Sequence, residues 1–403
     1  MSIYLKAKAF GVVNTVLLII KGWERADPSV LFISLLNFHC PISPRKDIFD
    51  EPFDDGTLAK LAIYTHYLKE WAPVFLAKKV PIWKTIQIFD FCAGRGNDGA
   101  GVKGSPLVAI EELNKWCEHI ATKNLTVRLV LSEPRKKYFD HLTEVIKPLI
   151  RPQFYTSPTH QKEFEQLFEE EYPSMKGAAN LVFIDQNGIK MITKEVFAQI
   201  IDLSQTDLLF FISSSFFTRF SESDAFRQYI QIDKKDIEEN KYHRIHQTVF
   251  NYYKNLIPAN KNYYLAPFSI KKGSNIYGLI YGSNHTLGIE KFLSVCWKMD
   301  EQRGTANFDV DDDRINPSAP SLFEEFNVPK KIQVFEQDIE ELILAKKITT
   351  NRQLYHYALL QGFQPAHANK KIEELKRDKK IGFDFSPVKN NIHKIEVQPI
   401  KIL

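Results

Sequence analysis

The chain has 403 residues, of which 44% are hydrophobic and 25% charged, as in an ordinary soluble protein of two or three domains. Lys and Arg outnumber Asp and Glu by only 53 to 49, a net charge of +4 that does not by itself indicate a nucleic-acid-binding protein. The four cysteines are scattered without a CxxC pair. This argues against a structural zinc site and a disulfide framework, and it favours a reducing, cytoplasmic compartment.

The first 55 residues read as an N-terminal extension. Their apolar run, Phe10–Ile20, is shorter than the roughly 20 residues that span a bilayer, and no small-residue cleavage site follows it. We expect a buried element here and no contact with a membrane. An amphipathic helix should follow over Thr57–Ala72, with Asp54 and Asp55 favouring its start and Pro73 ending it.

From residue 86 the pattern alternates between apolar strands and amphipathic helices. Such alternation predicts a parallel sheet covered by helices on both faces. The expected strands are Ile86–Phe91, Val127–Leu131, Leu181–Ile184 and Leu208–Ser213, and the expected helices are one opened by Ser105-Pro106, then Pro134–Ile150, Gln161–Glu171 and Ile192–Leu203.

Two features close this domain, which we place at residues 56–300. Residues 219–260 read as a polar, mostly helical insertion. Asn262–Ile270 and Ile276–Ser283 then form a predicted hairpin, so an antiparallel pair ends the sheet. This layout is that of a Rossmann-like class I S-adenosylmethionine-dependent methyltransferase.

Residues 301–330 read as a linker, and residues 331–403 as a winged-helix domain. Three helices, Val334–Lys346, Asn351–Leu360 and Pro365–Arg377, precede a hairpin of Ile381–Phe385 with Ile392–Val397. From Lys330 to the end, 14 Lys and Arg face 9 Asp and Glu, so the positive charge gathers in this domain.

The strand that starts at Ile86 ends in Asp90 and turns through Ala93, Gly94 and Gly96. Glycines allow a close backbone approach, a carboxylate can accept from a cationic amino group, and Glu133, after the next strand, can hold ribose hydroxyls. We interpret this as an S-adenosylmethionine site. The Gly94-x-Gly96-x-x-Gly99 pattern also matches the fingerprint of a dinucleotide site, although no helix begins directly after it. A glycine loop that binds no ligand is the remaining alternative.

Asp185 follows the strand Leu181–Ile184, where amino-methylating enzymes place an Asp or Asn before two prolines and an aromatic residue. Here Gln186, Asn187 and Gly188 stand instead, which weakens the expectation of base methylation. Asp185 could equally cap the next helix. Ser213, at the end of the apolar strand Leu208–Ser213, is a second candidate for the acceptor side, with little support as a nucleophile.

Two sets of basic residues remain. His243 and His246 have metal-like spacing but no carboxylate cluster, so we predict no metal. In the predicted third helix of the winged helix and just beyond it, basic residues could contact phosphates, or could simply form a solvated face. They are Lys370, Lys371, Lys376, Arg377, Lys379 and Lys380.

Taken together, the motifs resemble the three-Cys-motif partner (TcmP) family over most of the chain. The resemblance implies a methyltransferase-like fold, a bacterial source, and a two-component system near mobile or phage-defence genes, whose partner carries three clustered cysteines like a radical S-adenosylmethionine or iron–sulfur protein. Many relatives have His-Thr where Gly56-Thr57 stands, proline at Arg95, and Asp-Pro at Asp185-Gln186. The segments that carry the resemblance are Glu51–Lys60, Ile88–Gly96, Gly104–Leu107, Phe183–Lys190, Thr206–Ser215, Pro267–Gly273, Ile276–Ser283 and Ala306–Asp309.

Two hypotheses follow. In the first, the chain is a methyltransferase that acts on DNA, RNA or a nucleotide. In the second, it is a non-catalytic adaptor that keeps the fold and binds nucleic acid or the three-Cys-motif partner. The departures at Arg95 and Gln186 favour the second, and a dehydrogenase is a distant third.

Overall fold

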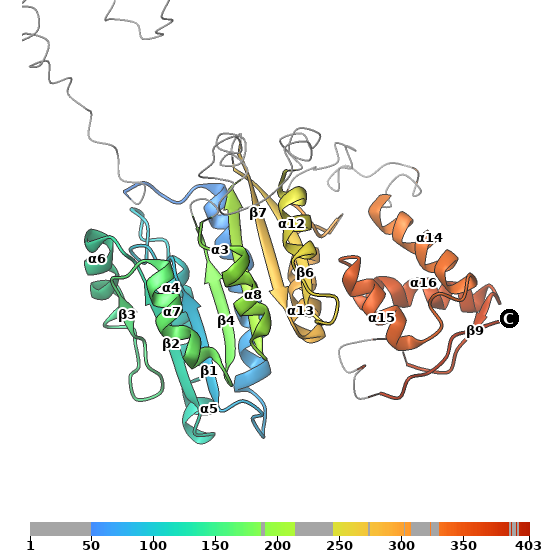
Figure 1. Cartoon of the computed structure of the whole chain (residues 1–403), viewed down its shortest axis with the longest axis horizontal. Helices are drawn as coiled ribbons and strands as arrows, with labels where there is room; N and C mark the ends of the chain where they lie inside the picture. The colour runs from blue at the N-terminus through green and yellow to red at the C-terminus, as the bar shows by residue number, and fades with distance from the viewer. Residues whose placement is uncertain are drawn as a thin grey trace, which may run out of the picture. The chain divides into compact units, whose positions relative to one another are not determined.

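The computed structural model describes residues 50–186, 190–213, 245–272, 275–301, 303–307, 323, 330–386, 388, 392 and 395–403 (Figure 1). The apolar run Phe10–Ile20, most of the predicted insertion and most of the predicted linker lie outside these ranges. No described helix is long and apolar enough to cross a membrane.

A seven-stranded sheet forms the centre of the described chain, in the order β3-β2-β1-β4-β5-β7-β6. The first five strands are parallel, and β7 runs antiparallel to both β5 and β6. This strand order confirms the predicted class I methyltransferase fold with its closing hairpin. The strands are β1 (Thr85–Asp90), β2 (Thr126–Ser132), β3 (Thr159–His160), β4 (Ala179–Ile184), β5 (Thr206–Ser213), β6 (Tyr264–Lys272) and β7 (Asn275–Ser283).

Helices cover both faces of the sheet. Successive strand residues point to opposite sides, and apolar side chains on both sides must be buried. On β4, for example, Leu181 and Phe183 enter one core cluster, and Val182 and Ile184 enter the other. The first face carries α3 (Asp55–Leu76), α4 (Ser105–Lys115), α5 (Cys117–Thr122), α6 (Lys136–Ile146) and α13 (Thr286–Met299). The second carries α7 (Phe164–Met175), α8 (Lys194–Asp202) and α12 (Ile245–Asn255) (Figure 1).

The helix α3 starts two residues before the predicted Thr57 and ends four residues after the predicted Ala72. Asp54 caps it by accepting a hydrogen bond from Thr57 N at 2.9 Å. The prediction that Pro73 ends it is wrong, since Ala77 N still bonds to Pro73 O at 3.0 Å. Burial of the last turn, including Phe75 and Leu76, outweighs the single hydrogen bond that proline removes.

Three helices of the C-terminal domain are as predicted, and α15 and α16 have the predicted bounds. The predicted hairpin is wrong in its second strand, because β8 pairs with the last residues of the chain rather than with 392–397. Two-residue strands carry too little alternation to be found by pattern. The elements are α14 (Lys330–Leu344), α15 (Asn351–Leu360), α16 (Pro365–Arg377), β8 (Ile381–Gly382) and β9 (Lys401–Ile402).

The C-terminal domain packs on α13 and β6. Tyr355 Oη donates to Glu290 Oε2 at 2.6 Å, and Trp297 Nε1 donates to Gly362 O at 3.0 Å. Part of the predicted linker is also structured, because Ala306 bridges to Ser269 at the free edge of β6. The sheet and the winged helix therefore share an interface within the described residues.

Candidate functional site

Three carboxylates lie at one edge of the sheet. Asp90 is the last residue of β1, Glu133 follows β2, and Asp185 follows β4. Since β1 lies between β2 and β4 in parallel register, the structure brings these three sequence-predicted residues together. In α/β sheets, ligands bind at this carboxyl edge.

Asp90 is fully buried and only partly satisfied. Its Oδ1 accepts from Cys92 N at 3.1 Å, but its Oδ2 has no hydrogen-bond partner in the described chain. Burial raises the pKa of the Asp90 carboxyl to about 7, the charges of Asp185 and Glu133 add to the rise, and the Ser105 hydroxyl and Cys92 N–H oppose it. The site thus holds an unmatched acceptor that a cationic donor would satisfy.

The turn after β1 contains two residues that need glycine. Gly94 has φ 59° and Gly96 has φ 95°, both in the left-handed region. A Cβ on Gly96 would also lie 2.9 Å from Val145 Cγ2 of α6. Ala93 N donates to Ser132 O at 2.9 Å, which ties the turn to the end of β2. Gly96 therefore serves the packing of α6 as well as the turn.

A carboxylate that the sequence analysis missed, Asp98, organises the remainder of this loop. Its Oδ1 accepts from Ala100 N at 2.9 Å and Val102 N at 2.7 Å, and its Oδ2 accepts from Phe53 N at 2.7 Å. Burial alone would raise the pKa of the Asp98 carboxyl, but these backbone N–H groups lower it overall. The Asp98 carboxylate thus holds the loop Gly96–Lys103 in a defined conformation.

The Arg95 side chain contacts the segment before α3 and the backbone of its own turn. Its Nη1 lies 3.0 Å from Asp50 Oδ1, and its Nε donates to Asn97 O at 3.0 Å. Its carbonyl lies 2.9 Å from His141 Nδ1 of α6. Arg95 therefore joins the segment before α3 to the glycine turn.

Glu133 is buried but already paired. Its Oε1 accepts from Arg135 Nε at 2.8 Å and Arg135 N at 3.0 Å, whereas its Oε2 has only a 3.5 Å contact with Arg135 Nη2. The Arg135 side chain is half exposed and lies over the Tyr138 ring. One carboxylate oxygen therefore retains the capacity to accept from hydroxyl groups.

Asp185 has a partner that the sequence analysis did not find. Lys60 Nζ, from α3, lies 2.6 Å from Asp185 Oδ1, although 125 residues separate the two in the chain. The next residue, Gln186, turns inward, and its Oε1 accepts from Met191 N at 3.0 Å. The backbone of Ser213 pairs with Tyr277, but its side chain, like Asn187 and Gly188, lies outside the described residues.

The six basic residues of the tail have different environments. Lys371 is buried and lies 2.9 Å from Glu340 Oε2 and 3.1 Å from Glu374 Oε1, so it serves α14–α16 packing. Lys370 Nζ lies 3.4 Å from Glu336 Oε1, and Lys380 Nζ lies 2.5 Å from Glu340 Oε1. Lys376 Nζ donates to Phe383 O at 3.1 Å.

Arg377 and Lys379 are exposed at the end of α16 and just after it. Arg377 has only a 3.7 Å contact with its neighbour Asp378. Within the described part of the chain, no ion pair involves Lys379. These two side chains are the most available of the six for phosphate contacts.

Metal-ligand clusters are not found among the described residues: nowhere in those ranges do three His, Cys, Asp or Glu side chains gather in a way that could hold an ion. His243 and the side chain of His246 lie outside these ranges.

Comparisons with known proteins identify one domain and several similar structures. A family model described as a GMT-like winged-helix (wHTH) domain matches residues 307–386. No curated protein sequence matches the chain.

Among solved structures, an O-methyltransferase from Bacillus cereus in complex with S-adenosylhomocysteine is 12% identical, with 67% of this chain and 96% of that one covered and a TM-score of 0.32. The O-methyltransferase TomG of Streptomyces achromogenes in complex with S-adenosylmethionine is 11% identical, with coverages of 63% and 94% and a TM-score of 0.31. A candidate transferase from Pyrococcus horikoshii is 9% identical, with a TM-score of 0.28, and covers 55% of this chain. The chain spans 63% of that protein's length.

Proposed function

We propose that the chain binds S-adenosylmethionine at the carboxyl edge of its sheet and acts as a methyltransferase-like protein. The unmatched Asp90 Oδ2 carries this proposal, because a buried acceptor without a donor is costly unless a ligand supplies one. The amino group of S-adenosylmethionine is a cationic donor, and Asp90 Oδ2 would accept a hydrogen bond from it.

The residues of the chain would divide the binding between them. Asp90 would pair with the ammonium group, Glu133 would accept from ribose hydroxyls through its less occupied Oε2, and the turn Ala93–Gly96 would allow the close backbone approach. When bound, S-adenosylmethionine supplies a methyl group attached to a sulfonium. Asp185 and Ser213 would face the acceptor, where positioning rather than acid–base chemistry is needed.

The winged-helix domain supports nucleic acid as the acceptor or binding partner. Arg377 and Lys379 would contact phosphates, with Lys370, Lys376 and Lys380 adding to the local positive potential. The sequence resemblance to three-Cys-motif partner proteins suggests, in addition, a bacterial two-component system in which a three-cysteine protein is the partner. We also place the protein in the cytoplasm, in line with its scattered cysteines.

A second candidate function is the adaptor, in which the fold is kept and turnover is lost. Two observations favour it. Arg95 is engaged by Asp50, and Arg135 already occupies one oxygen of Glu133. Such an adaptor would bind nucleic acid or the three-Cys-motif partner without needing the cofactor.

Calorimetric titration with S-adenosylmethionine separates the two functions. The wild type should bind in the micromolar range, and Asp90→Asn should weaken binding by about a hundredfold, since a charge-assisted hydrogen bond is lost. Glu111→Gln is the matched control, because Glu111 is an exposed acid on α4 whose partner is Lys103. Absence of heat from folded wild-type protein would contradict the methyltransferase reading and favour the adaptor. Gly96 is unsuitable for this test, since its substitution would disturb α6.

A further inference from the structure

A buried lysine reaches the acceptor side of the carboxylate edge. Lys60 is 7% exposed, and its Nζ lies 2.6 Å from Asp185 Oδ1. The same ammonium lies 4.9 Å from the centroid of the Phe211 ring and 4.5 Å from that of Tyr277. One carboxylate and two aromatic rings together offset the cost of burying this charge.

The ion pair decides what Asp185 can do. A carboxylate has about four lone-pair positions, and the side chain of Asp185 is 30% exposed, so one bond to Lys60 leaves capacity for a donor on a ligand. A carboxylate that shares its charge with an ammonium is suited to accept a hydrogen bond rather than to remove a proton. An amino group needs such an acceptor for its N–H, whereas a hydroxyl acceptor would need a base.

An aromatic ring accompanies this acceptor. The stretch after β4 lacks the aromatic residue that would stack on a substrate, but Tyr277, near the start of β7, lies beside the same ammonium as Asp185. Phe211 is fully buried and can only support the lysine, whereas Tyr277 is half-buried. Base recognition commonly combines a polar group at the base edge with an aromatic platform.

We propose that Lys60 is a positioning residue that holds Asp185 as a hydrogen-bond acceptor for the amino group of a planar heteroaromatic ring, with Tyr277 as the platform. The ligand class is an amino-bearing nucleobase, adenine or cytosine, in a free nucleotide or in a single strand. This inference rests on the proposed function, because it assigns the acceptor side of the same site.

The test is calorimetric titration of the full chain saturated with S-adenosylhomocysteine. The probes are AMP and CMP, each compared with its N,N-dimethylated form, which lacks the N–H. Short single-stranded oligonucleotides of adenine or cytosine form a second arm that distinguishes a nucleic-acid source from a free nucleotide. We expect dimethylation to weaken binding to the wild type by about tenfold, the equivalent of one good hydrogen bond.

The variants separate positioning from folding. Lys60→Met should lower the affinity for AMP and CMP to that for their dimethylated forms. Lys60→Arg should restore the difference in affinity between the two kinds of nucleotide. Lys291→Met is the matched control, because Lys291 lies 2.7 Å from Glu70 in a comparable ion pair away from this edge. Affinity for S-adenosylhomocysteine is measured for each variant so that the nucleotide titrations are run at saturation, and circular dichroism checks that each is folded. If Lys60→Met does not fold, the two single variants Lys60→Arg and Asp185→Leu are compared instead. Lys60→Arg should keep the difference in affinity, and Asp185→Leu should lose it.

The outcomes are distinct. Failure of every probe to bind, or discrimination that persists in Lys60→Met or Asp185→Leu, would overturn this inference while leaving cofactor binding intact. Failure of S-adenosylhomocysteine to bind would overturn the proposed function instead. The titrations are then repeated without it, so the acceptor side is still measured.

Discussion

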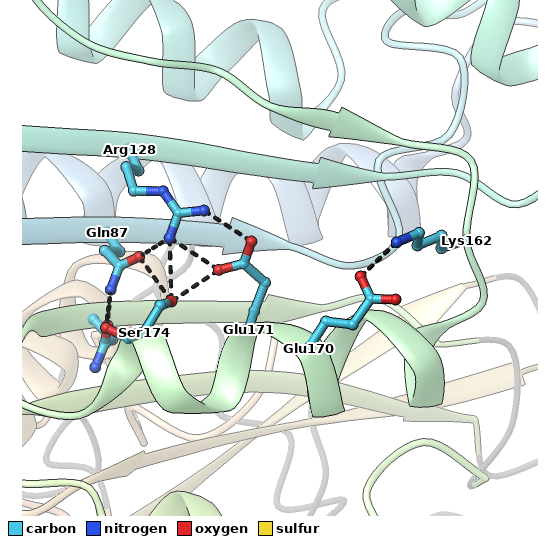
Figure 2. A network of polar contacts seen from close by, with 7 residues as sticks. Gln87, Arg128, Lys162, Glu170, Glu171 and Ser174 are labelled. Carbon is cyan, nitrogen blue, oxygen red and sulfur yellow. Dashed lines mark hydrogen bonds and ion pairs between the residues drawn. The ribbon is translucent and has the colours of Figure 1, made fainter.

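Two buried polar clusters on the same strands differ in how well they are satisfied. In the first, Arg128 donates to Glu171 Oε1 at 2.8 Å, Glu171 Oε2 at 2.9 Å and Gln87 Oε1 at 2.6 Å, and Ser174 Oγ donates to Glu171 Oε2 at 2.8 Å (Figure 2). Gln87 Nε2 in turn donates to Ser174 O at 2.7 Å. This cluster joins β1 and β2 to α7.

The second cluster is the carboxylate edge, only three residues further along β1. There Asp90 is as buried as Gln87, but its Oδ2 is unmatched. Burial alone would raise the pKa of Glu171, yet Arg128 and Ser174 lower it overall, whereas the pKa of Asp90 is raised. A matched buried charge contributes to the fold, and an unmatched one is retained at a cost that a ligand can offset.

Removing a partner from the matched cluster should have the largest effect on stability. Arg128→Met leaves the Glu171 carboxylate buried without its cation, so we expect a loss of about 3 kcal/mol in the free energy of unfolding. Urea titration measures it. Lys162→Met is the control, since it breaks the more exposed pair with Glu170 of the same helix α7 and should leave the free energy of unfolding nearly unchanged. Equal losses in both variants would remove the distinction between the clusters.

Neutralising Asp90, in the unmatched cluster, should raise the free energy of unfolding rather than lower it. The folded pKa of Asp90, about 7, is above its ordinary value of 3.8, so the unfolded chain releases this proton first and stability falls as pH rises between these values. Asp90→Asn removes the penalty. We expect it to be more stable than the wild type by about 4 kcal/mol at pH 8 and about equal at pH 4. Destabilisation at pH 8 would show that Asp90 is a structural group.

The same contrast, on a smaller scale, applies to the basic residues of the winged helix. Lys371 is matched by two carboxylates, so Lys371→Met should cost about 1 kcal/mol of stability. Lys379→Met should leave stability unchanged and reduce the salt slope of DNA binding by about one. Stability follows from thermal denaturation and the slope from binding at several salt concentrations. A DNA affinity that responds only to Lys371 would contradict the assignment.

The sequence predicted local features well and distant pairs poorly. The strand ends at Asp90, Glu133 and Asp185 follow from apolar runs and the turns after them, and the start of α16 follows from Pro365. Lys60 could not be found this way, because its partner lies 125 residues away and depends on how α3 crosses the sheet. The winged hairpin was misplaced for the same reason, since β9 is defined by pairing rather than by pattern.

The pH dependence of S-adenosylmethionine affinity tests the central claim most directly. If the ammonium binds the ionised Asp90, the protein must release that proton on binding, so affinity should fall by up to about tenfold per pH unit below pH 7 and level off above it. Calorimetry in two buffers of different ionisation enthalpy at pH 6 should show release of close to one proton. Binding that is independent of pH between 5.5 and 8, without proton release, would contradict the account.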